Sequence, residues 1–350
     1  MLKKGILMTD RRVLWLDLMN PSDVLFFRPI MSRLNDVDFR ITLRDRAETI
    51  SLAKMCGIEG RIVGRHHTDR LRKYLGAISR YAKLTSAAGK YDVGMSFEGG
   101  LTVAVGRIRR RPSLLFCDND LKLFQKRIYL QDLENSMKLR ADKIVIPSAC
   151  YDSFAAHTEK ERLVKFDGYK EDVYIGDFKP DPGFSSKLPY KRYVVLRPEA
   201  LDSGYVERKM TLVPELLELL LKAGSNVVYL PRESYDYRPP QNPNVFMPHE
   251  ALNGLDLCYH SEGVITGSGT LAREAACMGK PAVSFFPGEK LLSVDSRLIE
   301  EGRMIHSRDP RGIVDYVLSK AMKGPESDFQ RSAKVLSEVV DITNGILRGL

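Results

Sequence analysis

The chain has 350 residues, 43% of them hydrophobic and 28% charged, a composition that fits a soluble globular protein of about two domains. It contains no apolar run near the roughly 20 residues of a membrane helix. The start, MLKKGILMTDRR, lacks a signal-peptide core and cleavage site, so we expect a cytoplasmic protein. The net charge of +9 suits an anionic partner, but no zinc-finger or RNA-binding motif accompanies it, which disfavours nucleic acid.

Short apolar segments alternate with amphipathic segments through the first half of the chain. We expect strands at 13–18, 39–43, 60–64, 92–96, 113–117 and 143–147. Helices are expected between them at 24–34, 47–56, 68–88 and 100–108. This alternation predicts a doubly wound parallel sheet.

The stretch GDFKPDPGFSSKLPYK, residues 176–191, has no periodicity and is predicted to be a linker. The alternation then restarts, with strands at 193–196, 226–230, 244–247, 262–266 and 282–286. The helices expected there are 211–223, 249–254, 270–278, 310–322 and 327–348. We therefore predict two Rossmann-like domains, 1–175 and 192–326, and a C-terminal helix in 327–350 that can pack back on the first domain. Doubly wound sheets bind ligands at the carboxyl ends of their strands, so the cleft between the domains is the expected site.

A glycine-rich turn, TGSGTLAREAACMGKP, links a predicted strand to a predicted helix at 266–281. Gly267 and Gly269 would let a phosphate approach the first N–H groups of the helix, and Ser268 and Thr270 add hydroxyl donors. Glu274, one turn into the helix, can accept hydrogen bonds from a ribose diol. The alternatives are glycines that serve packing only and a glutamate that stabilises the helix dipole.

Other charged and metal-ligating residues are less specific. The arginines of 107–111 predict either a solvated helix end or a site for anionic lipid or polyphosphate. His66 and His67 have no third ligand nearby in sequence, so we expect no metal. The five cysteines are scattered without a C-x-x-C pair and are expected to be buried free thiols: Cys56, Cys117, Cys150, Cys258 and Cys277.

Three segments carry a resemblance to a known family: WLDLMNPSDVLFFRPIMSRL, IVGRHH and ITGSGTLAREAACMGKPAVSFFPGEKLLSVDSRLIEEG. They resemble an uncharacterised, mostly archaeal family of GT-B-like proteins, related to glycosyltransferases and to non-hydrolysing UDP-N-acetylglucosamine 2-epimerases. The resemblance covers nearly the whole chain. It implies a GT-B fold, in which two Rossmann-like domains face a cleft, the first on the acceptor side and the second binding the nucleotide sugar.

The resemblance implies roles for residues of the second domain. The diphosphate would lie on Gly267, Ser268, Gly269 and Thr270, and the ribose on Glu274. The loop after the next strand would touch the sugar through Glu289, Lys290 or Asp295. Arg197 and Arg232 follow strands and can neutralise a phosphate, or can form surface ion pairs instead.

Candidate general bases lie in the first domain, after its strands. They are Asp23, Glu98 and Asp118, with Asp17 facing the same edge. The alternative roles are a helix N-cap for Asp23 and turn chemistry for Glu98. The epimerases carry a His-Arg pair where this chain has Leu196 and Arg197, so the pattern departs from theirs.

The resemblance therefore favours a GT-B-type glycosyltransferase with a UDP-sugar donor, acting in cell-surface glycan synthesis. A sugar-nucleotide 2-epimerase and a non-catalytic nucleotide-sugar-binding protein remain alternatives. No metal or other cofactor is expected, because a helix dipole and basic side chains can steady the leaving diphosphate. The acceptor is open; a lipid-linked acceptor would place the protein at the periphery of a membrane.

Overall fold

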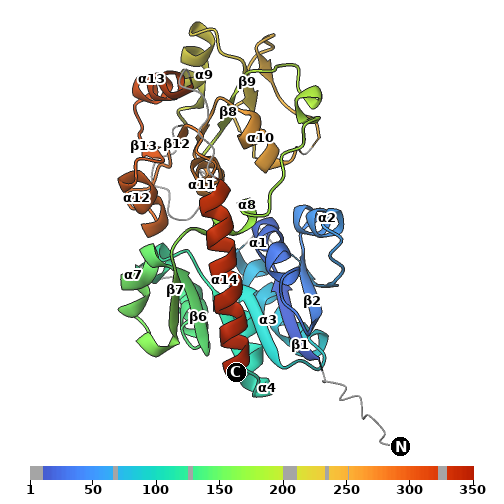
Figure 1. Ribbon diagram of the computed structural model, residues 1–350. Coiled ribbons are helices and arrows are strands. Elements are labelled where there is room, and N and C mark those ends of the chain that lie inside the picture. Colours follow the sequence, from blue (N-terminus) through green and yellow to red (C-terminus); the bar gives the residue numbers. More distant parts are fainter. Residues whose placement is uncertain are drawn as a thin grey trace, which may run out of the picture. The chain divides into compact units, whose positions relative to one another are not determined.

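The computed structural model describes residues 11–65, 70–124, 129–199, 211–232, 236–250, 252–321 and 329–350 (Figure 1). The chain divides into two compact units. Unit 1 comprises residues 1–167 and 337–350, and unit 2 comprises residues 168–336. The boundary between the units therefore falls within the last helix.

The described part of unit 1 is built on a seven-stranded parallel sheet of order β3-β2-β1-β4-β5-β6-β7. Its strands are β1 (Arg12–Leu18), β2 (Val37–Asp45), β3 (Arg61–Arg65), β4 (Val93–Phe97), β5 (Ser113–Phe116), β6 (Lys143–Pro147) and β7 (Leu163–Phe166). Its α-helices are α1 (Pro21–Met31), α2 (Ala47–Met55), α3 (Arg70–Ala87), α4 (Gly100–Arg109), α5 (Leu121–Phe124), α6 (Tyr129–Lys138), α7 (Tyr151–Ala155) and the end of α14 (Phe329–Gly349).

The core of unit 1 follows from the continuous apolar runs of its central strands. Leu14, Trp15 and Leu16 of β1 are fully buried, as expected for a parallel strand covered on both faces. On one face, Phe26 packs edge-on against Phe97 and Phe116, with ring centroids 4.9 and 5.2 Å apart. These aromatic contacts hold α1 against β4 and β5.

A buried ion pair joins β1 to α3. Arg80 donates from Nη2 to Asp17 Oδ1 at 2.7 Å and from Nη1 to Asp17 Oδ2 at 3.0 Å. Thr42 also donates to Asp17, at 2.7 Å. Gly64 has a φ of +75°, and a Cβ there would come within 2.7 Å of the Arg80 side chain, so the glycine makes room for the arginine. Asp17 was expected to face the ligand edge, but its carboxylate is fully buried in this pair.

The described part of unit 2 has a six-stranded parallel sheet of order β10-β9-β8-β11-β12-β13. Its strands are β8 (Val194–Arg197), β9 (Val227–Tyr229), β10 (Val245–Phe246), β11 (Gly263–Thr266), β12 (Ala282–Ser284) and β13 (Ile305–His306). Its α-helices are α8 (Lys170–Ile175), α9 (Val213–Lys222), α10 (Gly254–His260), α11 (Gly269–Cys277), α12 (Ser293–Glu300), α13 (Pro310–Ala321) and the start of α14. Both sheets share the Rossmann order, which confirms the predicted pair of doubly wound domains.

Several sequence-based expectations differ from the structure, and helices α5, α6, α7, α8 and α12 were not expected. A helix was expected at 249–254, but α10 begins at Gly254, because the Asn253 side chain caps it by accepting from Leu255 N at 3.0 Å. The edge strands β7 and β13 were not expected. They have four and two residues, too few for the alternation of apolar residues to stand out.

Several contacts tie distant parts of the chain together within each unit. In unit 1, Asp167 N donates to the Glu338 carboxylate of α14 at 3.2 and 3.3 Å. In unit 2, Ser332 of α14 donates to Asp172 of α8 at 2.7 Å. Residues 176–191, predicted as a linker, fall within unit 2, where the Phe184 ring stacks on His260 with centroids 5.6 Å apart.

The cysteines largely follow the expectation from the sequence. All five cysteines are free, and four of them are buried. Among the residues that the structure describes, no helix is both long and apolar enough to cross a membrane.

We expect Arg80→Met to lower the free energy of unfolding by about 3–5 kcal/mol, because it leaves the buried Asp17 carboxylate unpaired. Urea unfolding measures the change. Adding Asp17→Asn should restore much of the loss. The matched control is Asp38→Asn, which breaks the exposed Arg11–Asp38 pair and should change stability by less than about 1 kcal/mol. Equal effects at the two pairs would contradict this account.

Candidate functional site

The predicted nucleotide residues of unit 2 meet at the carboxyl edge of its sheet. β8 lies between β9 and β11 in the sheet. From β8 the chain adds β9 and β10 on one side and then β11, β12 and β13 on the other. Arg197, at the end of β8, pairs in register with Thr266 at the end of β11, and Gly267 N donates to Arg197 O at 3.0 Å. Such a switch point is where doubly wound sheets leave a crevice for a ligand.

Both glycines of the turn have a packing reason. A Cβ on Gly267 would lie 2.5 Å from the Glu199 Cα, too close for any side chain. A Cβ on Gly269 would lie 2.8 Å from Arg273 Nη1. The close packing that was weighed as the alternative reading is therefore present, and a phosphate contact would be an additional role.

The start of α11 presents its free backbone N–H groups at this edge. Ser268 occupies the N-cap position, but its side chain makes no capping hydrogen bond. The Ser268 amide is used locally, because it donates to Thr266 Oγ1 at 2.9 Å. The following amides of the first turn have no partner inside the helix, which is the arrangement that binds anions.

Arg197 is partly exposed, and among the described residues no carboxylate forms an ion pair with it. Its Nε is buried, and within the described part of the chain no acceptor reaches it. Burial lowers the pKa of Arg197, and the neighbouring charge of Arg232 lowers it further, while Glu274 raises it. Arg232 itself is exposed. A buried N–H group without an acceptor is unfavourable unless a ligand supplies the missing acceptor.

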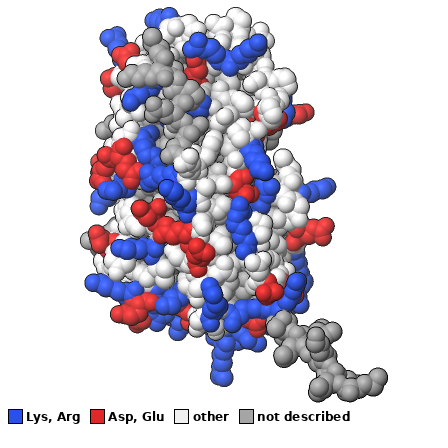
Figure 2. Space-filling model, in the orientation of Figure 1, with Lys and Arg blue, Asp and Glu red and all other residues white. Residues whose placement is uncertain are grey.

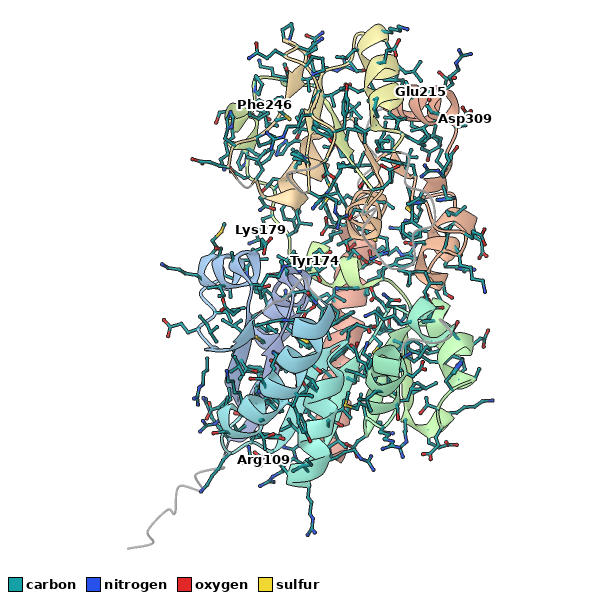
Figure 3. All side chains as sticks on the ribbon, turned by 180° about the vertical axis from the view of Figure 1, so that it is seen from behind. Arg109, Tyr174, Lys179, Glu215, Phe246 and Asp309 are labelled. Atoms are coloured by element: carbon teal, nitrogen blue, oxygen red, sulfur yellow. The ribbon has the colours of Figure 1, made fainter. Side chains whose placement is uncertain are left out.

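Glu274 lies on α11 beside this arginine and is buried. Its Oε1 accepts the Tyr174 hydroxyl of α8 at 2.8 Å (Figure 3 labels Tyr174). No group of the described residues donates a hydrogen bond to Oε2. A Cβ added at Gly254 would lie 4.0 Å from this oxygen. Burial raises the pKa of Glu274 to about 7; the Tyr174 hydrogen bond opposes this rise, and the charge of Glu171 adds to it.

A second arginine, Arg273 of α11, holds the site in place. Arg273 is buried, and it donates from Nε to Glu171 Oε1 and from Nη1 to Asp295 Oδ1, both at 2.9 Å. Its Nη2 also reaches the Thr270 hydroxyl, at 3.5 Å. Asp295 was expected to touch the sugar, but its carboxylate binds Arg273. Glu289 and Lys290 of the same region are exposed.

Sequence reasoning missed both Arg273 and Tyr174. Arg273 and Glu274 form a charged pair within the otherwise small and apolar segment LAREAAC, and all residues from 271 to 277 are buried. That pattern could have flagged Arg273. Tyr174 has no local signal, because it lies 100 residues before Glu274.

The base candidates of unit 1 also lie at a carboxyl edge, that of the seven-stranded sheet. Asp23 is buried at the third position of α1, where Oδ2 accepts the amides of Met19 and Asn20, each at 3.0 Å. The alternative weighed for Asp23 was the N-cap position, but Asn20 occupies it, and Asp23 completes the capping box from the third position of the helix.

Glu98 and Asp118 are brought together after β4 and β5. Glu98 Oε1 accepts the amides of Asp118 and Asn119 at 3.2 and 3.1 Å, and Oε2 accepts Lys138 Nζ at 2.5 Å. Despite burial, the charge of Lys138 and these hydrogen bonds lower the pKa of Glu98 to about 2. Glu98 also has a left-handed φ of 57°, which marks a specialised turn. A carboxylate held this firmly in its charged form is a weak base.

The other candidates do not join these groups. His66 and His67 lie outside the described residues. Within the described ranges, no three His, Cys, Asp or Glu side chains are placed as a metal site. An open hollow of about 530 Å³ lies in unit 1, away from all of the predicted residues, and its lining includes Asp132, Arg140 and His157.

The chain belongs to the family described as "Protein of unknown function (DUF354)", whose model matches residues 12–344. It is 27% identical over 323 residues to the uncharacterized protein MJ0665 of Methanocaldococcus jannaschii. That match covers 87% of this chain and 90% of the relative. The resemblance found in the sequence is thereby confirmed.

Solved structures share the fold at low sequence identity. A UDP-GlcNAc 2-epimerase of M. jannaschii, in complex with UDP-GlcNAc and UDP, matches with a TM-score of 0.68 and 13% identity, over 93% of this chain and 99% of that one. The spinosyn forosaminyltransferase SpnP matches with a TM-score of 0.58 and 15% identity, over 95% of each chain. These likenesses confirm the GT-B fold.

The raised pKa of Glu274 predicts a specific pH dependence of stability. Between about pH 4.5 and 7 the unfolded state loses this proton while the folded state keeps it, so stability falls as pH rises. Glu274→Gln removes the titration. Relative to the wild type it should be stabilising by up to about 3 kcal/mol at pH 8 and near neutral at pH 4.5. Urea unfolding at both pH values tests this, and an unchanged pH profile in the variant would contradict it.

Proposed function

We propose that the protein is a GT-B-type glycosyltransferase that uses a nucleotide-sugar donor, with UDP-sugar as the first choice. Unit 2 binds the nucleotide in this proposal. The diphosphate lies between Arg197 and the start of α11, and Glu274 holds the ribose. The sugar is displaced directly from its anomeric carbon by an acceptor hydroxyl.

The observation that carries the proposal is the buried Nε–H of Arg197, which no acceptor among the described residues reaches. Arg273, a buried cation of the same edge, has two carboxylate partners at 2.9 Å. Arg197 has none among the described residues, and it lies beside uncapped helix amides. Together these groups supply positive charge and N–H donors to one anion, which is the chemistry of diphosphate binding.

Glu274 supports a ribose beside that anion. Tyr174 fixes one oxygen, and the other is left to accept from a ligand hydroxyl. The nucleotide base is inferred from the structural neighbours alone, of which the M. jannaschii epimerase is described as a complex with UDP-GlcNAc and UDP.

Asp118 is the strongest of the three base candidates. The Asp23 carboxylate accepts two amides of its own helix start, and the pKa of Glu98 is too low for proton abstraction near neutral pH. Glu98 instead positions Asp118 by accepting its amide. In this role Asp118 takes the proton of the acceptor hydroxyl as that oxygen attacks the anomeric carbon.

Epimerisation of a sugar nucleotide is the second candidate. The higher TM-score of the M. jannaschii epimerase, 0.68 against 0.58 for the transferase SpnP, favours it. The same nucleotide site would serve both reactions, so binding alone does not choose between them.

Nucleotide binding tests the site first. UDP or UDP-GlcNAc should raise the melting temperature of the wild-type protein, because a ligand that binds only the folded state stabilises it. Arg197→Met and Glu274→Ala should each weaken binding about 10- to 100-fold, through the loss of charge-assisted hydrogen bonds. Arg197→Met should not lower the stability of the free protein, since it removes a buried N–H group that has no acceptor among the described residues.

Arg192→Met is the matched control for the binding test. Arg192 lies at the other end of β8, where it is 76% exposed and pairs with Glu262. This variant should bind UDP as the wild type does. The nucleotide assignment is wrong if no nucleotide shifts the melting temperature, or if Arg197→Met binds normally.

Turnover of UDP-GlcNAc in D2O separates the two reactions. Epimerisation breaks the C2–H bond, so deuterium enters C2 without an acceptor, and NMR detects it. Glycosyl transfer leaves that hydrogen in place and releases UDP only when an acceptor hydroxyl is present. Asp118→Asn should lower turnover by about 100-fold or more while UDP affinity is kept. Full turnover in Asp118→Asn would exclude it as the base.

A further inference from the structure

The end of α4 combines an exposed apolar side chain with four arginines, all within residues 107–111. Ile108 is 64% exposed in the last turn of this helix. Arg107 precedes it, and Arg109, Arg110 and Arg111 follow, with Arg110 ending the helix in the left-handed conformation. We use the name basic edge for the surface formed by the exposed side chain of Ile108 and by seven basic residues: Lys90, Arg107, Arg109, Arg110, Arg111, Arg140 and Arg348.

The charges of the basic edge are fixed in place but mostly not neutralised. Arg107 donates to the carbonyl of Arg140 at 3.2 Å. Arg109 donates to the carbonyls of Thr85 and Gly89 at 3.2 and 2.6 Å. A carbonyl holds a guanidinium group without cancelling its charge. Among the described residues, one carboxylate forms an ion pair with these arginines. It is Asp92, which lies 3.7 Å from Arg111, and both side chains are about half exposed.

The topology of unit 1 gathers further positive charge at the same place. In a doubly wound sheet, helices end where the next strands begin, so the ends of α4 and α6 lie at the amino edge of the sheet. Lys90, before β4, and Arg140, before β6, are exposed there. Figure 2 shows blue side chains along the margin where α4 and the C-terminus lie in Figure 1, and Arg348 belongs to that terminal turn. Figure 3 labels Arg109 at this margin.

We propose that the basic edge docks unit 1 on the surface of an anionic lipid bilayer. The arginines meet the lipid phosphates, and Ile108 enters the boundary between headgroups and acyl chains. Basic side chains around an exposed aliphatic residue match a membrane surface in both charge and polarity. The inference does not depend on the nucleotide site or on the proposed reaction.

The position of the basic edge leaves the rest of unit 1 free. Glu98 and Asp118 follow the carboxyl ends of β4 and β5, whereas the basic edge lies at the amino ends of the same strands. A membrane bound there would not cover the carboxyl edge.

Co-sedimentation of the full chain with lipid vesicles tests the proposal. Vesicles of phosphatidylglycerol and phosphatidylcholine should bind the protein at about 0.1 M salt and release it at about 0.5 M, because surface charge is screened. Pure phosphatidylcholine should not bind. Arg107→Gln with Arg110→Asn should weaken binding about 25-fold, at roughly fivefold for each charge. Asn is chosen at 110 because it tolerates the left-handed conformation.

The control removes the same charge in unit 2. Arg311→Gln with Lys320→Gln changes two exposed residues of α13 and should leave vesicle binding unchanged. Ile108→Ser should weaken binding about tenfold with the arginines intact. Melting temperatures of all variants should match the wild type, since every substituted side chain is exposed.

Three results would overturn the proposal. The first is no binding to anionic vesicles at low salt, or equal losses in the control variant. The second is binding that Ile108→Ser leaves unchanged and that free inorganic polyphosphate displaces, which would make the basic edge a site for a soluble anion. The third is a dimer, seen by sedimentation velocity at the same salt, that Ile108→Ser abolishes, which would make it a contact between copies of the chain.

Discussion

A charge inside a protein is stable only with a partner, and both units are arranged around this requirement. Arg80 is held by Asp17, Lys138 by Glu98, and Arg273 by Glu171 and Asp295. Each of these pairs fastens a helix to another element of its unit, so the same contacts that satisfy a charge also fix the carboxyl edges of the sheets. Arg197 departs from the pattern, because its buried Nε has no acceptor among the described residues.

This contrast separates the two kinds of role that an acidic or basic residue can have at a sheet edge. Glu98 and Asp295 lie where a ligand could be expected, yet their charges are already satisfied by Lys138 and Arg273. Arg197 and one oxygen of Glu274 lie at a similar edge with nothing placed on them by the described residues. A position at the end of a strand makes a charged residue a candidate for ligand binding. Its hydrogen-bond partners in the protein then decide whether it remains available to a ligand.

The fold could be predicted from the sequence because the parallel strands are continuous apolar runs and the turns carry glycine. The segment ending in Thr266, for example, was expected as a strand from its apolar run alone. The partners of the site could not be predicted in the same way. Tyr174 reaches Glu274 across 100 residues, and Lys138 reaches Glu98 across 40, so no local pattern records either contact. The pairing of Asp295 with Arg273 depends equally on tertiary packing.

Both units depend on long-range contacts to α14. The bond between Asp172 and Ser332 spans 160 residues, and the bond between Asp167 and Glu338 spans 171. Each unit therefore needs a piece of α14 to complete its own contacts. Both sheets already have all of their strands by His306, so α14 adds contacts to finished sheets and not a strand to either of them. Cutting the chain between β13 and α14 would leave both units without a native partner at once, although only one helix is lost.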